Sequence, residues 1–72
     1  MGNFTDNLRN RRVQLGMNQT ELAKKIGVTP TTIWLYERGE ATPKIDIALR
    51  LAKVLGVTIE QLVGEDPPKA SQ

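Results

Sequence analysis

The stretch NQTELAKKIGVTPTTIWLYERG, residues 18–39, decides the fold of this chain. Its first half carries the signals of a short helix. Asn18 can accept a hydrogen bond as an N-cap, and Glu21 three residues later can bond back to the N–H of the cap, which makes a capping box. Gly27 can take the left-handed conformation that ends a helix. The pattern therefore predicts a helix between Asn18 and Gly27.

The second half of the stretch repeats these signals. Thr29 can cap a helix whose first residue is Pro30, the helical position that proline fits best, and Gly39 can end it. The turn between the two helices is then only residues 27–29. Such a pair is a helix-turn-helix, in which the second helix can enter a major groove of DNA. Capped helix pairs also occur in ordinary small bundles, so a purely structural role stays open.

The outer face of the second helix favours a binding role. Ile33 and Tyr36 fall on its inward side at helical period. A solvated helix would carry Glu and Lys on the opposite side, whereas this one carries Pro30, Thr31, Trp34, Leu35 and Arg38. We expect this face to contact a partner.

Three runs, NQTELA (18–23), GVT (27–29) and ERG (37–39), resemble the signature of the lambda-repressor-like (Cro/cI, XRE) family of DNA-binding domains. The similarity covers about residues 4–63 and includes the phage 434 repressor domain. The resemblance implies a sequence-specific transcriptional regulator. It also implies that Arg12 pairs with Glu37, and that the amide of Gln19 bonds the phosphate backbone.

The rest of the chain completes an all-α, compact five-helix bundle. A first helix, capped by Thr5 or Asn3 and ended by Gly16, has its buried side marked by Phe4, Leu8 and Leu15. A fourth helix follows the loop at Pro43, closes at Gly56, and has a predicted apolar side made of Ile45, Ala48, Leu49, Ala52 and Leu55. A short fifth helix, capped by Thr58, runs from Ile59 to Val63.

Arg9, Arg11 and Arg12 form a basic cluster, for which a solvated helix face is the plainest interpretation. Arg12 is the exception because of its implied pairing. Position 11 is usually apolar in the family, so either the stem of Arg11 covers the edge of the core or the first helix packs less fully there.

Length and composition limit the possible functions. The 72 residues are enough for one domain, predicted at residues 1–64, with residues 65–72 as a disordered tail or linker. Cysteine and histidine are absent, and the net charge is +2. The sequence therefore lacks the commonest zinc ligands and gives no indication of a cofactor, a small-molecule ligand or an enzyme. No apolar run approaches the ~20 residues of a membrane span, so we expect a cytoplasmic protein with no membrane partner.

Double-stranded DNA is the expected partner. Base contacts are predicted for Thr31, Leu35 and Pro30, although proline has no donor and offers only van der Waals contact. Phosphate contacts are predicted for Gln19, Asn18, Trp34, Arg38 and Lys44. One short helix reads too few base pairs to specify a genomic site, which predicts a homodimer on a pseudo-palindromic operator, with Ile59 and Val63 at the dimer interface.

A protein-interaction module, of the antitoxin or adaptor type, is the alternative. Trp34 and Leu35 would then dock a protein, and any DNA binding would be weak. Arg38, Lys44 and Gln19 favour DNA. We expect a repressor, but no residue in the sequence distinguishes a repressor from an activator.

Overall fold

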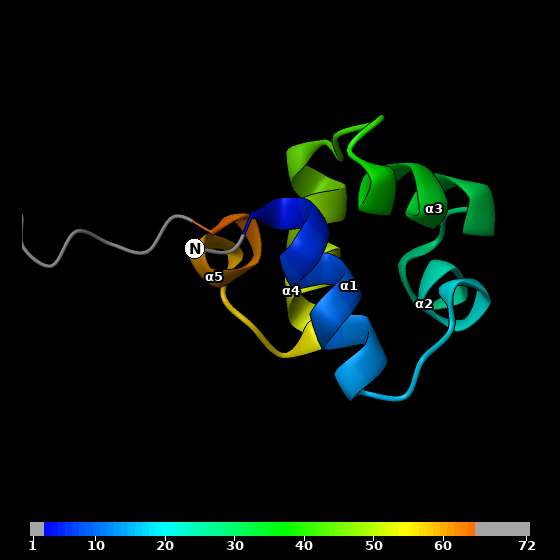
Figure 1. Ribbon diagram of the computed structural model, residues 1–72, viewed down its shortest axis with the longest axis horizontal. Coiled ribbons are helices and arrows are strands. Elements are labelled where there is room, and N and C mark those ends of the chain that lie inside the picture. The colour runs from blue at the N-terminus through cyan, green and yellow to red at the C-terminus, as the bar shows by residue number, and fades with distance from the viewer. Residues whose placement is uncertain (1–2, 65–72) are drawn as a thin grey trace, which may run out of the picture.

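The computed structural model describes residues 3–64, and five α-helices lie within this range in the predicted order. They are α1 (Phe4–Gln14), α2 (Gln19–Ile26), α3 (Pro30–Arg38), α4 (Ile45–Leu55) and α5 (Ile59–Val63). In Figure 1, α1 and α4 lie at the centre, α2 and α3 lie on one side of them, and α5 lies on the other. The prediction of an all-α, five-helix bundle is confirmed. The predicted tail, residues 65–72, lies outside the described residues.

The turn between α2 and α3 is built as its residue types require. Asn18 Oδ1 accepts from the N–H of Glu21 at 2.7 Å, and Glu21 Oε1 accepts from the N–H of Asn18 at 2.9 Å, which completes the capping box. Gly27 has φ +80°, the left-handed conformation that strains any residue with a Cβ. Thr29 Oγ1 then accepts from the N–H of Thr32 at 3.2 Å and starts α3. Because both ends of the turn are capped, the angle between the two helices is fixed locally.

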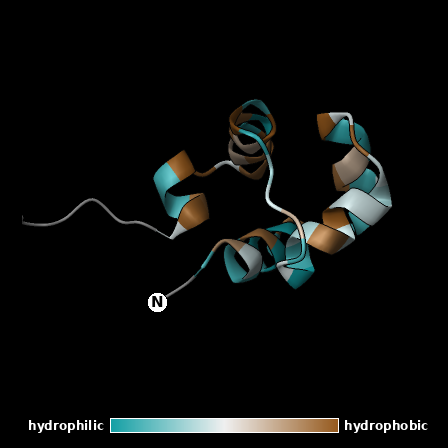
Figure 2. Cartoon of the chain, turned by 90° about the horizontal axis from the view of Figure 1, so that it is seen from above, coloured by the Kyte–Doolittle hydropathy of each residue, from teal (hydrophilic) through white to brown (hydrophobic). Residues whose placement is uncertain are grey.

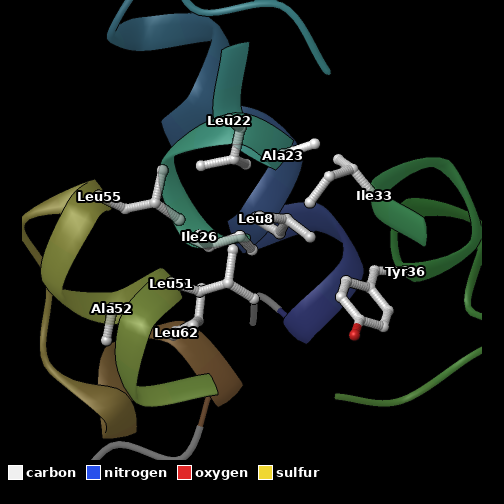
Figure 3. Close-up of a cluster of buried hydrophobic side chains, with 10 residues drawn as sticks. All are labelled: Leu8, Leu22, Ala23, Ile26, Ile33, Tyr36, Leu51, Ala52, Leu55 and Leu62. Carbon is white, nitrogen blue, oxygen red and sulfur yellow. The ribbon is translucent and has the colours of Figure 1, made fainter. Parts of the chain in front are cut away.

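One apolar core joins all five helices. Its buried residues are Leu8, Leu22, Ala23, Ile26, Ile33, Tyr36, Leu51, Ala52, Leu55 and Leu62. Figure 3 shows these side chains converging, and Figure 2 shows how hydrophobic and hydrophilic segments alternate along the helices that supply them. Removing apolar surface from water in this way is the main favourable term in folding. None of the helices between residues 3 and 64 combines the length and the apolar character needed to cross a membrane.

An aromatic contact ties α3 to the start of α1. The rings of Phe4 and Tyr36 meet edge to face, with 6.2 Å between their centroids. Burial raises the pKa of the Tyr36 phenol above its ordinary value of 10.0, and the nearby Asp46 carboxylate raises it further. The phenol is therefore neutral at physiological pH.

The predicted buried faces of α1 and α4 are partly wrong. Leu15 is 43% exposed, because α1 ends at Gln14 and the chain turns away from the core after it. On α4, Ile45 and Leu49 are exposed, whereas Leu51, which the prediction left out, is fully buried. The side of α4 that packs faces α2 and α5, and three of the five residues predicted for it, Ala48, Ala52 and Leu55, are buried as expected.

Two arginines satisfy carbonyl groups at the ends of other helices. Arg11 Nε donates to the carbonyl of Leu55 at 2.8 Å, which closes the C-terminus of α4 and accounts for an arginine at a position expected to be apolar. Arg50 Nη1 donates to the carbonyl of Ile26 at 3.2 Å and does the same for α2. The last carbonyls of a helix have no partner within it, so these bonds stabilise both ends and fix how the helices sit.

Candidate nucleic-acid interface

A hydrogen-bonded network at Glu37 holds α3 against α1 and α2. Arg12 Nε donates to Glu37 Oε2 at 2.6 Å, and Arg12 Nη2 donates to Glu37 Oε1 at 3.1 Å. Gln19 Nε2 donates to the same Oε1 at 3.1 Å, and Arg12 Nη1 donates to the carbonyl of Met17 at 2.9 Å. The structure thus contains the pair that the family resemblance implied, in a two-pronged geometry that guanidinium groups favour.

Burial makes this network important for the placement of α3. The side chain of Arg12 is 12% exposed and that of Glu37 is 7% exposed, so water screens their attraction only weakly. A charge left unpaired at such a site is costly. The three side chains come from three helices, which means that the network sets the position of α3 relative to both α1 and α2.

The outer face of α3 lies open to solvent over most of its length. Pro30 and Thr31 are exposed at its start, and Trp34 is 45% exposed one turn later. Leu35, predicted to lie outside, is only partly exposed because it sits at the boundary with the packed side. The face that could meet base edges is therefore formed by Pro30 and Thr31, with Leu35 at its margin.

Arg38 is held in place by two neighbours. Its guanidinium lies over the Trp34 ring, 4.7 Å from the centroid, and its Nε donates to Glu40 Oε2 at 2.9 Å. The Arg38 and Glu40 side chains are 52% and 51% exposed, and an ion pair this exposed is weak. Arg38 thus has a defined direction, while its terminal nitrogens can still donate elsewhere.

The two residues at the start of α2 that were predicted to bind phosphate use only some of their amide donors and acceptors within the protein. The carboxamide oxygen of Asn18 is used by the capping box, and one Nε2 hydrogen of Gln19 is used by Glu37. A primary amide has two N–H donors, so Gln19 keeps one that is not needed by the network. Lys44 lies at the N-cap of α4, beyond the loop that follows α3, and is exposed.

The predicted dimer residues border a large apolar hollow. Ile59 is half-buried, whereas Val63 is 38% exposed. Both line a hollow of about 580 Å³, formed also by Phe4, Pro43 and Ile45. The most exposed of these is Ile45, at 68%, a residue that the sequence pattern had placed in the core.

Sequence reasoning missed two side-chain contacts that shape this surface. The bond from Gln19 to Glu37 was not predicted, although a glutamine beside a capping asparagine already indicated a role at the helix start. The contact between Glu40 and Arg38 was not predicted either, although two residues of opposite charge flank Gly39. Both depend on how α2, α3 and the following loop are arranged.

The chain belongs to the helix-turn-helix family HTH_3, which matches residues 8–62. This range contains α2, α3 and α4 in full, together with most of α1 and α5. The lambda-repressor-like resemblance seen in the sequence is confirmed.

Named relatives and solved structures agree with this membership. The cryptic phage CTXphi transcriptional repressor RstR of Vibrio cholerae is 40% identical over 62 residues, which are 86% of this chain and 56% of that protein. The P22 c2 repressor, solved in complex with a synthetic operator, is 30% identical with a TM-score of 0.86, over 92% of this chain and 100% of that chain. The chain therefore spans little more than half the length of the RstR repressor.

The same fold also occurs within an enzyme. The hydroxypropylphosphonic acid epoxidase of S. wedmorenis is 35% identical with a TM-score of 0.77, but the alignment covers 93% of this chain and only 34% of that one. The likeness is thus to one part of the epoxidase.

Proposed function

We propose that this chain is a sequence-specific DNA-binding domain of a transcriptional regulator, a repressor that binds a pseudo-palindromic operator as a homodimer. The observation that carries the proposal concerns Glu37, the only acidic residue in α3. Both of its carboxylate oxygens are bound by Arg12 and Gln19. The exposed face of α3 consequently presents no unpaired carboxylate to a phosphate backbone, and it can approach DNA without a large repulsive term.

Base recognition falls to the start of α3. Thr31 is exposed, and its hydroxyl can donate to or accept from a base edge in the major groove. Pro30 supplies van der Waals contact only. Leu35 can touch a thymine methyl with the part of its side chain that remains exposed.

Phosphate recognition surrounds this reading surface. Gln19 and Asn18 lie at the start of α2, where the helix dipole favours an anion, and each has an amide N–H to donate. Trp34 and Arg38 lie further along α3, and Lys44 lies beyond the next loop. Such contacts fix the position of the domain on the duplex and carry no sequence information themselves.

A dimer explains how so small a reading surface can specify a site. Ile45, Ile59 and Val63 line one apolar hollow, and Ile45 and Val63 are exposed in the single chain, so a second copy of the domain would cover apolar surface there. In an isologous contact the same patch serves both subunits. RstR and the P22 c2 protein are named repressors, which favours a repressor over an activator.

A protein-interaction module remains the rival because Trp34 and Leu35 would also suit a protein partner. Catalysis is not part of the proposal, because the relatives RstR and P22 c2 are named as repressors.

Selecting bound sequences from a random duplex pool tests the proposal directly. We expect a recovered motif with two-fold symmetry, since two α3 helices should read two half-sites. A pool without enrichment, from a protein that is folded by circular dichroism, would instead favour the protein-interaction module.

A further inference from the structure

A second hollow, of about 310 Å³, lies beside the outer face of α3 where this helix meets α1 and α2. Its lining combines a flat ring, an amide and four charged groups, from Arg9, Arg12, Gln19, Trp34, Glu37 and Arg38. The sequence pattern assigned Arg9 to an ordinary solvated surface. The structure instead places it in the same hollow as the predicted phosphate contacts.

The charges in this hollow do not cancel. It holds three guanidinium groups and one carboxylate, which leaves two net positive charges. Arg12 and Glu37 neutralise each other at 2.6 Å and are nearly buried, so they add no net charge for a ligand. The positive charge that a ligand would meet comes from Arg9 and Arg38, both of which are exposed, and the exposed Glu40 carboxylate bound to Arg38 reduces it.

The Trp34 ring gives the hollow a rigid wall. The Arg38 guanidinium is held 4.7 Å from the ring centroid, so its direction is set before any ligand binds. Its Nε is engaged by Glu40 at 2.9 Å, while the two terminal nitrogens are not used by that bond. A guanidinium held in this way loses little conformational entropy when it binds an anion.

We propose that this hollow binds a phosphate of the duplex DNA backbone, with Arg9 of α1 and Arg38 of α3 as the two cationic donors and Trp34 as the wall. The inference rests on the proposed function and adds α1 to the DNA contact surface. Planar guanidinium groups match the oxygens of a phosphate, and a concave site with a net positive charge attracts an anion. The hollow adjoins Gln19 at the start of α2, so it extends the row of predicted phosphate contacts along one edge of α3.

Replacing Arg9 by glutamine in the full 72-residue chain tests the assignment, since this change removes the charge and keeps a good helix former. Affinity should fall about three- to ten-fold at low salt for every duplex sequence, and the slope of log K against log salt should flatten by about one. The order of preference among sequences should stay the same. Arg9→Lys, which keeps the charge, should restore most of the slope.

Lys53→Gln is the matched control. It removes the same charge from an exposed position in the last turn of α4, outside the lining of the hollow, and should leave the slope close to that of the parent. An equal loss in Arg9→Gln and Lys53→Gln would mean that only total charge matters, which overturns the assignment.

Trp34 supplies a second readout, because it is the only tryptophan in the chain and lines the hollow. Its emission should change when a duplex is added, and the change should weaken in Arg9→Gln. If Arg38→Gln flattens the salt slope and Arg9→Gln does not, the assignment of Arg9 is wrong while DNA binding stands. If the parent binds no duplex but a polyglutamate peptide changes Trp34 emission in an Arg9-dependent way, the hollow is an acidic-peptide site, and the proposed function fails as well.

Discussion

Single residues show where the sequence was informative and where it was not. The pairing of Arg12 with Glu37 came from family resemblance alone, because no spacing rule connects residues 25 positions apart. Once the pair is present, its chemistry follows from burial: the carboxylate accepts from a guanidinium and from the Gln19 amide, and the Glu37 side chain is only 7% exposed. The sequence indicated that Arg12 and Glu37 pair. The additional bond from Gln19 to Glu37 depends on how three helices pack and could not be predicted from it.

Among the described residues, two arginine–glutamate pairs differ in burial and in the number of hydrogen bonds that the glutamate accepts, which allows a paired test of the network. Glu37→Ala should lower the free energy of unfolding by about 3 kcal/mol, since it strands a nearly buried guanidinium. Glu40→Ala should cost less than about 1 kcal/mol, because its pair with Arg38 is half exposed. Urea unfolding measures both. Equal stabilities for the two variants would reduce the Arg12–Glu37 pair to a surface contact.

Glu40 should act against DNA binding. Its carboxylate occupies the Nε of Arg38 and places a negative charge beside a predicted phosphate contact. Glu40→Gln should therefore raise affinity a few-fold, by roughly the same factor for all duplex sequences. Titrations at several salt concentrations measure the effect, and Glu60→Gln, on exposed α5, is the control of equal charge. A gain that persists undiminished in the Arg38→Gln background would show that Glu40 does not act through Arg38.

At the scale of the helices, most caps were predictable, whereas parts of the buried faces of α1 and α4 were not. A cap is decided by a few neighbouring residues, and Asn18, Thr29 and Thr58 each accept the predicted kind of bond. The face of α4 depends on which neighbour packs against it. Helical spacing relates Ile45 to Leu49 and also Leu51 to Leu55. Only the positions of α2 and α5 decide that Leu51 and Leu55 are the buried pair.

Two leucines of α4 test this selection directly. Leu51 is fully buried and Leu49 is 52% exposed, on the same helix and two residues apart. Leu51→Ala should lower the free energy of unfolding by about 2–5 kcal/mol through lost burial and the cavity left behind. Leu49→Ala should change it by less than about 0.5 kcal/mol, since it is a surface substitution. Chemical denaturation measures both, and a larger loss at Leu49 would contradict the packing of α4.

For the whole molecule, the exposure of Ile45 on α4 adds an apolar residue to the surface around the predicted dimer interface. Ile45 was expected to complete the core but stands exposed beside the apolar hollow that Val63 and Ile59 border. Exposed apolar side chains that gather in one patch often mark a surface that a partner covers. The predicted dimer residues are thus part of a larger patch than the sequence indicated. This patch borders α5, which lies at the opposite end of the bundle from α2 (Figure 1).

The apolar patch formed by Ile45, Ile59 and Val63 should join two copies of the domain on DNA. If two copies meet through it, their α3 helices should enter successive major grooves, about 34–36 Å apart on one side of the duplex. A whole operator should then bind far more tightly than a half-site, because the second contact becomes effectively intramolecular. Gel-shift or anisotropy titrations of both duplexes measure the ratio. Adding about half a helical turn between the half-sites should abolish the gain, since the two sites then face opposite sides of the duplex.

Val63→Asp should abolish the gain as well, by placing a charge in the contact without touching α3. Val63 is 38% exposed, so the free domain should tolerate the change, and an unaltered half-site affinity is the internal control. The free protein can remain largely monomeric, because the DNA holds the two copies together and makes the contact between them effectively intramolecular. Binding of one protomer at full strength to a half-site, insensitive both to the spacer and to Val63→Asp, would mean that this domain reads DNA alone and that the exposed Ile45 patch serves another partner.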